Sequence, residues 1–531
     1  MQTIFRNPFI LSISSAILLW CSWPVDGWIW LVFIAFVPLL YLENALLKAN
    51  CISYKVFIWS YLTFLLWNVL CTWWIKNASL GGAAMAIFAN ALVMSLFFQF
   101  YHHLRKNYRA SLFMFIPIWL SFEYLHFHWD LAWPWLSLGN VFANHIYWIQ
   151  WYEFTGMEGG TLWILLVNVM VCKFLNHSIQ NSTFTYRPII RIILYVLIPI
   201  LISYYLFHNY KEVENPIEIV IVQPNIDPYN EKFGAMSSRD QVDSFIHLAE
   251  EKISNKTTLV IGPETALPWS IWQHELEEHP DVLLLKEFLN KHPHISILIG
   301  ASTNKIYFPE DQKSKTARKL RDENLYYDSY NSALLLQYQK PIQVYHKSRL
   351  VPGVEKMPFP ALLGFLENYA LDMGGTSGSL GTEKEPKAFQ VNPELKAVPA
   401  ICYESVFGDY IASFVLNHCG LICVITNDGW WGDTPGYKQH LSYARLRAIE
   451  NRRAIARSAN TGISAFINQK GEIIQSTQWW EKSVLKSDVN INEELTFYVR
   501  HPALIYKLAV LFLVSSYFFL LFKGKKLVHK N

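Results

Sequence analysis

Long apolar runs separated by short polar breaks fill the chain from residue 9 to residue 207 and return once between residues 502 and 522. A helix needs about 20 apolar residues to cross the hydrocarbon core of a bilayer, and only helices and closed barrels can cross it. Runs of this length therefore predict a helical membrane domain. We expect about eight spans, at residues 9–22, 27–42, 56–75, 82–101, 111–126, 161–175, 189–207 and 502–522.

The first of these runs also fits the apolar part of a secretory signal peptide, with Arg6 as its positive flank. Cleavage of such a peptide requires small residues just before the cut, whereas this run ends with Leu19-Trp20-Cys21. We therefore interpret residues 9–22 as a span.

The Lys and Arg residues in the breaks favour one orientation of the spans. Every second break along the chain belongs to a basic set, and the breaks between them are nearly free of Lys and Arg. The long break at 126–160 belongs to this second set and contains neither Lys nor Arg. Cytoplasmic loops are enriched in Lys and Arg. We therefore expect both termini in the cytoplasm and the region after the seventh span on the extracytoplasmic face. The basic set comprises Arg6, Lys48, Lys55, Arg105, Lys106, Arg109, Lys173, Arg187, Arg191 and the lysines of the tail.

The break at 126–160 is rich in Trp, including Trp133 and Trp135. Trp and Tyr prefer the interface between membrane and water. The break is therefore either an aromatic belt or a lipid-facing loop at the mouth of an active site.

Composition excludes two classes of protein. The chain has 45 Lys and Arg against 42 Asp and Glu, and this net charge of +3 argues against a nucleic-acid partner bound by bulk positive charge. Seven cysteines in 531 residues exclude a disulfide-rich scaffold. Charged residues make up 16% of the chain, below the roughly 25% of a typical soluble domain, which fits a membrane protein.

Between the seventh and eighth spans the chain reads as a soluble region. Short β-branched runs alternate there with helical spacing, as in 217–223 followed by 239–253, which predicts a layered α/β fold. We therefore expect a membrane domain at 1–210, a soluble domain at 211–500, and a last span with a basic tail at 501–531.

Three of the predicted strands end at residues that can carry chemistry, namely Glu264, Cys402 and the pair Asn427-Asp428. Active sites of α/β folds gather at strand ends. A free Cys is often only a small buried side chain. Cys402, however, is followed by polar residues at a turn into a helix, a position that stabilises a thiolate.

The base or cation that a nucleophilic Cys requires is not evident from any single residue. His346 and His440 look like packing or hydrogen-bonding histidines. A lone lysine such as Lys347 is usually solvated, and Glu264 alone could equally be a helix cap.

Taken together and in chain order, three motifs resemble the signatures of the nitrilase superfamily. They are Gly-Pro-Glu ending at Glu264, Lys347 ahead of a Leu-Val-Pro stretch, and the Cys-Tyr-Glu that begins at Cys402. The resemblance implies an α-β-β-α sandwich. It also implies that Glu264 is the general base, Lys347 stabilises the oxyanion and Cys402 is the nucleophile.

Seven spans before this region and one after it resemble the apolipoprotein N-acyltransferase family of that superfamily. The resemblance covers nearly the whole chain, with further matching stretches at 133–135, 222–225, 426–430, 447–453 and 459–462. It implies supporting or substrate-binding roles for Glu355, Tyr403, Glu404, Asn331 and Trp430.

The family resemblance implies an enzyme that moves an acyl chain from a phospholipid, through a thioester on Cys402, to the α-amino group of the diacylglyceryl-cysteine of an apolipoprotein. It implies no metal and no other cofactor. It places the enzyme in the inner membrane of a bacterium, with the catalytic domain on the periplasmic face and against the lipid bilayer. We expect a monomer.

Two alternatives remain open from the residues. A membrane-tethered amidase of nitrilase type, which hydrolyses a C–N bond, shares the first half-reaction. A non-enzymatic receptor or scaffold predicts the loss of Glu264, Lys347 or Cys402, and all three are present.

Some stretches carry weaker expectations. The family commonly has a Gly directly before the second Glu, whereas Gly353-Val354 precedes Glu355 here. The aromatic residue that follows the first soluble strand is Tyr229 or Phe233. The apolar stretch 359–371 fits either a packed amphipathic helix of the soluble fold or a mobile lid, and our hypothesis is the lid. We interpret the charged stretch 307–328 as a solvated loop without assigned function.

Overall fold

The computed structural model describes residues 7–181, 186–320, 325–360 and 379–528. Its contacts divide the chain into two compact units. Unit 1 comprises Met1–Lys76, Gly82–Asn209 and Ala503–Asn531, and unit 2 comprises Asn77–Gly81 and Tyr210–Pro502.

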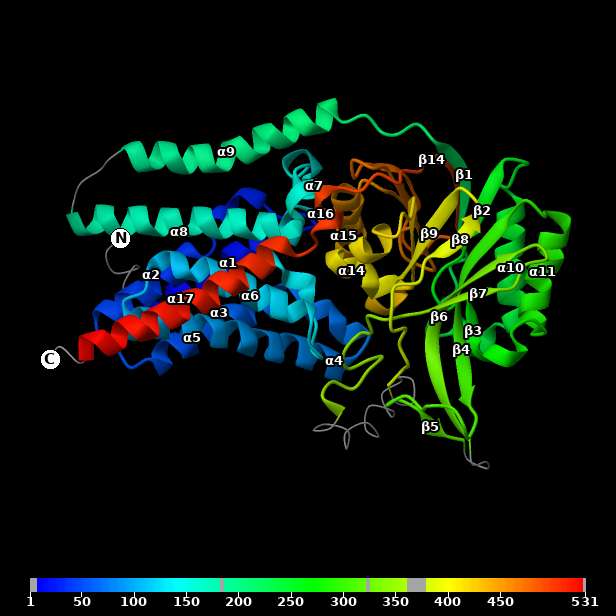
Figure 1. The fold of residues 1–531 in the computed structure, drawn as a ribbon, viewed down its shortest axis with the longest axis horizontal. Helices are drawn as coiled ribbons and strands as arrows, with labels where there is room; N and C mark the ends of the chain where they lie inside the picture. Colours follow the sequence, from blue (N-terminus) through cyan, green and yellow to red (C-terminus); the bar gives the residue numbers. More distant parts are fainter. Residues whose placement is uncertain (1–6, 182–185, 321–324, 361–378, 529–531) are drawn as a thin grey trace. The chain divides into compact units, whose positions relative to one another are not determined.

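Unit 1 is built from apolar helices (Figure 1). In the described residues, six helical segments are long and apolar enough to cross a membrane, and two apolar segments, Pro8–Cys21 and Leu112–Phe127, are shorter. The expected spans therefore all fall on helices. The main ones are α1 (Pro8–Cys21), α2 (Val37–Lys48), α3 (Tyr54–Thr72), α5 (Asn90–Tyr108), α6 (Phe115–Phe127), α8 (Met157–Asn181), α9 (Tyr186–Asn209) and α17 (Leu504–Val528).

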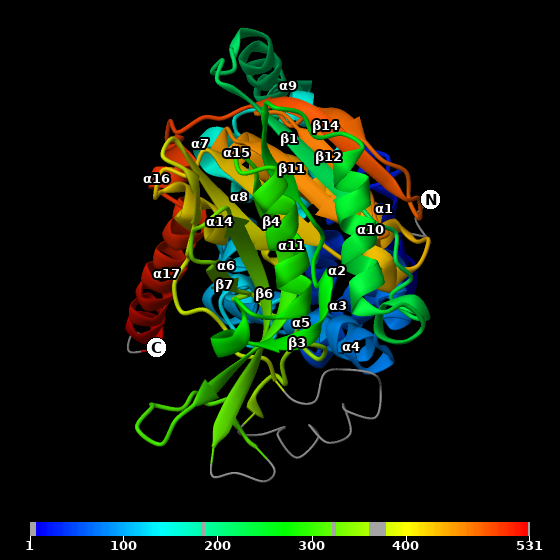
Figure 2. The same cartoon turned by 90° about the vertical axis from the view of Figure 1, so that its right-hand side faces the viewer.

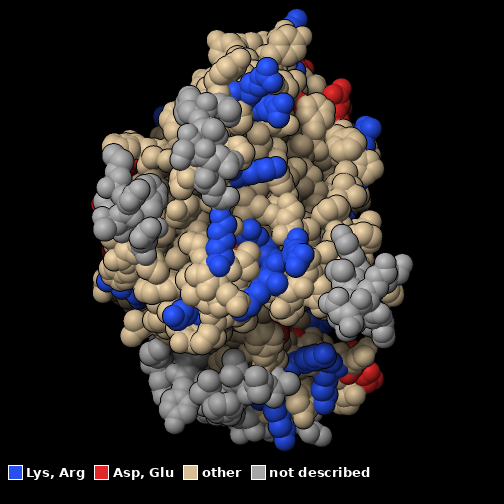
Figure 3. Space-filling view, turned by 90° about the vertical axis from the view of Figure 1, so that its left-hand side faces the viewer, with Lys and Arg blue, Asp and Glu red and all other residues tan. Residues whose placement is uncertain are grey.

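One end of unit 1 is basic. Helix α1 begins and α17 ends at this end (Figure 1). Helix α2 finishes with Lys48, and α5 finishes with Arg105 and Lys106 in its last turn. Figure 3 views this face, on which Lys and Arg side chains gather and Asp and Glu are few. The chain leaves α9 for unit 2 at the opposite end of unit 1, and it returns into α17 there (Figure 1).

The Trp-rich break folds into short helical turns: η6 (Pro134–Leu136), η7 (Leu138–Phe142), η8 (Ile146–Trp148) and α7 (Tyr152–Thr155). The rings of Trp133 and Trp135 stack at 5.4 Å, and both residues are buried, at 8% and 1% exposure. An exposed aromatic belt therefore does not describe these two residues.

Glu123 on α6 fixes this break within unit 1. Its buried carboxylate accepts hydrogen bonds from the backbone N–H of Leu138 (2.8 Å), the hydroxyl of Thr161 on α8 (2.8 Å) and the hydroxyl of Tyr506 on α17 (2.8 Å). The indole N–H of Trp119 donates a fourth (3.1 Å). One carboxylate thus joins three helices and the break.

Unit 2 holds two sheets. The first has the order β14-β1-β2-β4-β6-β5, with β3 also on β4 and β7 also on β6, and the second has the order β13-β12-β11-β10-β9-β8. Strands β1, β2 and β4 run parallel, as do β9, β10 and β11. The first sheet comprises β1 (Pro216–Gln223), β2 (Thr257–Ile261), β3 (Leu267–Trp272), β4 (Ser296–Tyr307), β5 (Arg318–Lys319), β6 (Tyr326–Gln337), β7 (Gln343–His346) and β14 (Ser483–Asn490). The second comprises β8 (Phe389–Asn392), β9 (Leu395–Ile401), β10 (Leu421–Thr426), β11 (Ala454–Ala459), β12 (Ala465–Ile467) and β13 (Ile473–Ser476).

The two sheets of unit 2 pack face to face between helices (Figures 1 and 2). Helices α10 (Ser238–Glu250) and α11 (Pro280–Lys291) cover the first sheet, and α14 (Gly408–Val415) and α15 (Pro435–Asn451) cover the second. Because the central strands are buried on both faces, they read as continuous apolar runs, as in Leu421–Thr426. The predicted α-β-β-α sandwich is confirmed.

Two peripheral stretches differ from the sequence expectations or lie outside the structure. Strands β4 and β6 pair antiparallel out to Tyr307 and Tyr326, so both ends of the stretch expected to be a loop at 307–328 are strand. The expected lid at 359–371 falls, beyond residue 360, outside the described residues.

Candidate active site

Cys402 stands at a sharp turn between strand and helix. Strand β9 ends at Ile401, and a 3-10 turn covers Cys402–Val406. The backbone φ of Cys402 is +49°, a left-handed conformation that costs energy in a residue other than glycine. The turn leaves Cys402 partly exposed, although both of its chain neighbours are buried.

Glu264 follows β2, and both oxygens of its carboxylate accept hydrogen bonds. Oε1 accepts hydrogen bonds from Asn331 Nδ2 (2.8 Å) and Lys347 Nζ (3.1 Å), and Oε2 accepts from the backbone N–H of Asn427 (3.0 Å). Gly300 on β4 passes so close that a Cβ there would lie 2.6 Å from Cα of Glu264. Glycine at this position therefore allows β4 to support the turn.

Lys347 directly follows β7, and its ammonium group lies between two carboxylates. Nζ is 3.1 Å from Oε1 of Glu264 and 2.8 Å from Oε1 of Glu355. Nδ2 of Asn331 on β6 also bridges the two carboxylates, and the backbone carbonyl of Asn331 accepts from the backbone N–H of Lys347 (2.8 Å). Glu355 thus contacts the ammonium group of Lys347, although Val354 and not Gly precedes it.

The charges of the site shift the pKa values of its groups. Burial raises the pKa of Glu264. The positive charge of Lys347 and the hydrogen bond that Asn331 donates to Glu264 outweigh burial and hold this pKa below its ordinary value. Burial opposes the charge on Lys347, yet Glu264 and Glu355 hold its pKa well above the ordinary value. Burial and Glu264 raise the pKa of Cys402, while Lys347 lowers it. Cys402 therefore rests as a thiol beside an ionised carboxylate.

Glu404 ties the loop of Cys402 to that of Lys347. Oε1 accepts from the hydroxyl of Tyr345 (2.6 Å) and the backbone N–H of Ser348 (2.7 Å), and Oε2 accepts from the backbone N–H of Ile401 (2.8 Å). Burial raises the pKa of Glu404 to about 7 against these donors. Glu404 is fully buried, and it holds these two loops together beneath the protein surface.

Tyr403 and Trp430 lie in different surroundings. Tyr403 is buried and packs edge-on against Phe407 at 5.1 Å. The backbone carbonyl of Trp430 accepts from the hydroxyl of Tyr229 (2.8 Å), and the two rings meet edge-on at 5.1 Å. Phe233 instead packs edge-on against Trp269, and both Tyr229 and Phe233 are exposed.

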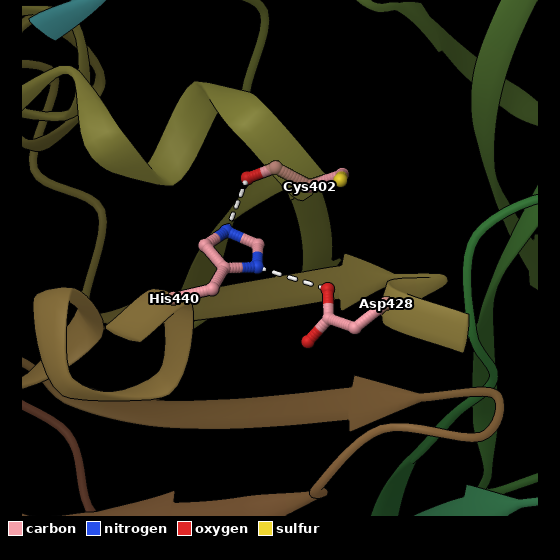
Figure 4. Close-up of side chains that lie close together, drawn as sticks. All are labelled: Cys402, Asp428 and His440. Carbon is pink, nitrogen blue, oxygen red and sulfur yellow. Dashed lines mark hydrogen bonds and ion pairs between the residues drawn. The ribbon is translucent and has the colours of Figure 1, made fainter. Parts of the chain in front are cut away.

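His440 contacts the backbone of Cys402. Nε2 lies 3.2 Å from the carbonyl oxygen of Cys402, and Nδ1 lies 3.0 Å from Oδ1 of Asp428. Figure 4 shows the ring between these two groups, with the sulfur of Cys402 directed away from it. His440 therefore acts as a hydrogen-bonding residue, as its sequence context suggested. His346, the other candidate, stacks on Tyr330 at 4.0 Å, and burial lowers its pKa to about 4.

Cys402, Asp428 and His440 also offer ligand atoms within 4.8 Å of one another, which raises the question of a metal. The carboxylate of Asp428 is already engaged, because Arg457, His440 and Thr426 all bond to it. Although burial opposes ionisation, Arg457 and His440 hold the pKa of Asp428 well below its ordinary value. This donor set serves an ion pair and does not fit a metal ion.

Sequence reasoning missed some residues that the structure brings to the site. Arg457 on β11 pairs with Asp428, and Lys232, in the short π-helix Glu231–Ala235, bonds to the turn of Glu264. Both are fully buried. A buried charge is rare, but only the fold reveals this burial.

Comparison with known proteins identifies the family. The model of the carbon-nitrogen hydrolase family matches residues 219–494, and that of the apolipoprotein N-acyltransferase N-terminal domain matches residues 15–170. The apolipoprotein N-acyltransferase of Chlorobaculum tepidum is 30% identical over 519 residues, which cover 95% of each chain. The chain belongs to the apolipoprotein N-acyltransferase family.

Other relatives agree with this assignment. The apolipoprotein N-acyltransferase of Geobacter metallireducens is 26% identical over 94% of this chain and 92% of its own. Among solved structures, Nit3 of Saccharomyces cerevisiae, a nitrilase-superfamily member, covers 53% of this chain and 92% of its own, with 14% identity and a TM-score of 0.37. The two family models and the two bacterial relatives confirm the resemblance drawn from the motifs, and membership of an acyltransferase family favours it over the amidase alternative.

Proposed function

We propose that this member of the apolipoprotein N-acyltransferase family transfers an acyl chain from a phospholipid to the α-amino group of the diacylglyceryl-cysteine of an apolipoprotein, the last step of lipoprotein maturation. The observation that carries the proposal is the meeting of Glu264, Lys347 and Glu355 beside Cys402. The catalytic domain in this proposal is the region at 211–500.

In the first half-reaction, Sγ of Cys402 attacks the ester carbonyl carbon of the phospholipid, and Glu264 takes the thiol proton. A Lys ammonium has three donors. Glu264 and Glu355 occupy two donors of Lys347 in the described structure, and the third binds the oxyanion. The carbon–oxygen bond then breaks, and Glu264 returns the proton to the alkoxide. A lysophospholipid leaves, and a thioester remains on Cys402.

In the second half-reaction, the acceptor amine attacks the thioester carbonyl. Glu264 takes a proton from the amine and gives it to Sγ of Cys402 as the carbon–sulfur bond breaks, which yields the amide and the free thiol. Glu355 keeps Lys347 in place through both halves. Asn331 donates to both carboxylates and keeps Glu264 directed into the site.

The remaining residues have supporting roles in this proposal. Glu404 sets the spacing between the loops of Cys402 and Lys347. Tyr403 packs beside the thiol of Cys402. The edge-on pair of Tyr229 and Trp430 provides an aromatic surface that contacts the lipid substrate. One chain supplies every reacting group, so we infer that the enzyme acts as a monomer.

Acyl transfer to an acceptor is the direct test of this function. Full-length protein in phospholipid vesicles is mixed with a diacylglyceryl-cysteine peptide that has a free α-amino group. We expect the peptide to gain the mass of one acyl chain, and Cys402→Ala to abolish the gain. Release of free fatty acid with an unchanged peptide would favour a hydrolase instead.

We further propose that both termini lie in the cytoplasm of a bacterium, with the catalytic domain on the periplasmic face of the inner membrane. The basic end of unit 1, at which α1 begins and α17 ends, supports this orientation. A protease-cleavable tag at the exposed Gln312 tests it. External protease should cut this tag in intact spheroplasts, whereas a tag after Asn531 should be cut only after lysis. The reverse pattern would overturn the orientation.

A further inference from the structure

Lys232 is a buried lysine that the proposed mechanism does not use. It lies in the π-helix Glu231–Ala235, and its exposure is 2%. A buried lysine is rare, because an ammonium group loses its hydration unless protein groups replace the water. The contacts of this side chain therefore require an explanation.

The ammonium group of Lys232 holds the turn that carries the general base. Nζ donates to the backbone carbonyl of Glu264 (3.2 Å) and to the hydroxyl of Thr265 (2.6 Å). The carbonyl of Lys232 accepts from Nε2 of Gln241 on α10 (2.8 Å), which anchors the lysine in turn. Thr265 has a φ of +49°, so the held turn includes a left-handed residue that needs support.

Lys232 also completes the charge balance of the site. Glu264 and Glu355 carry two negative charges, and Lys347 supplies one positive charge beside them. Asp428 is neutralised separately by Arg457. Among the described residues, Lys232 is the second cation that acts on Glu264. Burial lowers the pKa of Lys232 to about 8, against the attraction of Glu264.

We propose that Lys232 is a positioning residue for acyl transfer, which fixes the turn of Glu264 and balances its charge so that the carboxylate stays ionised and directed at Cys402. The inference rests on the proposed function of Glu264, Lys347 and Cys402. Lys232 touches neither the thiol nor the substrate in this account and acts through Glu264.

Replacement of Lys232 separates its charge from its bulk. Lys232→Met keeps the length of the side chain and removes the charge and both hydrogen bonds, whereas Lys232→Arg keeps the charge. Lys256→Met is the control, because Lys256 is exposed. Full-length variants are mixed with phosphatidylethanolamine in detergent micelles, and the acyl-enzyme is followed by intact mass during the first turnover.

We expect Lys232→Met to form the acyl-enzyme about 100-fold more slowly, as expected for a lost electrostatic contact in a catalytic site. Lys232→Arg should form the acyl-enzyme about tenfold faster than Lys232→Met, or faster still. Lys256→Met should match the rate of the wild type. A wild-type rate in Lys232→Met would overturn the proposal.

The pH dependence of Cys402 alkylation by iodoacetamide is a second measurement. A purely structural role of Lys232 would leave its pH midpoint unchanged. The charged groups acting on this thiol are Glu264, Lys347 and Asp428, and Thr426 bonds to it. With Lys232 gone, the uncompensated charge of Glu264 should raise the pH midpoint of alkylation by about one unit, and Lys232→Arg should not raise it. Equal midpoints in all variants would overturn the proposal. If the wild type forms no acyl-enzyme but the midpoint still moves, Lys232 keeps its role and the proposed function fails.

Discussion

Nζ of Lys347 lies 3.1 Å from Oε1 of Glu264, and both side chains are almost wholly buried. This ion pair joins the residue after β7 to the turn after β2, which lie 83 positions apart in the chain. Because each charge replaces the lost hydration of the other, removal of one partner is costly. The pair therefore governs both the stability and the proposed chemistry of the site.

Lys347→Met should abolish acyl-enzyme formation and lower stability. The substitution leaves the carboxylates of Glu264 and Glu355 without their shared cation. We expect at least a roughly 100-fold loss of rate and a lower thermal unfolding midpoint, measured on detergent-solubilised protein. The double variant Lys347→Met with Glu355→Gln should regain part of the midpoint but none of the rate. Retained activity in the single variant would refute the assigned role.

Glu264→Gln should show a pH-dependent stability defect. The folded state lowers the pKa of Glu264 below its ordinary value of 4.5. At a pH between the folded-state pKa and the ordinary value, the unfolded state therefore binds more protons than the folded state. The stability that ionised Glu264 contributes is thus fully present above the ordinary pKa and is lost as the pH falls through the folded-state pKa. Unfolding midpoints of wild type and variant should differ most near neutral pH and converge in acid. A difference between the two unfolding midpoints that grows on acidification would contradict a lowered pKa of Glu264 in the folded state.

Glu123→Leu should destabilise unit 1 strongly. The substitution removes the acceptor of four hydrogen bonds from α6, α8, α17 and the Trp-rich break. Each buried donor left without a partner costs about 1–3 kcal/mol. Tyr506→Phe removes a single one of these donors and leaves the carboxylate with the other three, so its unfolding midpoint should fall less. Equal midpoints in the two variants would show that the carboxylate is not the joining point.

The sequence predicts the fold where burial imposes a simple pattern. The apolar runs mark the membrane helices, and the buried parallel strands such as β10 are continuous apolar stretches. Strand β14 was missed, because its residues are half-exposed without regular alternation. The loop expected at 307–328 included Tyr307 of β4 and Tyr326–Asp328 of β6, because antiparallel pairing continues there through polar residues such as Asp328.

The candidate site was predictable only as an ordered set of motifs. Glu264 and Cys402 each follow a predicted strand, so a common strand-end location indicated these two, whereas Lys347 stood out only through its motif. Contacts across long stretches of chain left no local signal. Lys232 bonds to a turn 32 positions away, and Arg457 pairs with Asp428 across 29 positions. The sequence therefore indicated the proposed reacting groups, but it gave no sign of the buried charges near them.

Intact-protein mass spectrometry can detect the proposed covalent acyl-enzyme on Cys402. Purified full-length protein is incubated with phospholipid and compared with Cys402→Ala treated in the same way. We expect wild-type protein to gain the mass of one acyl chain, hydroxylamine to remove this adduct, and the variant to lack it. A folded wild-type protein that forms no adduct with any of several phospholipid classes would rule out a thioester on Cys402.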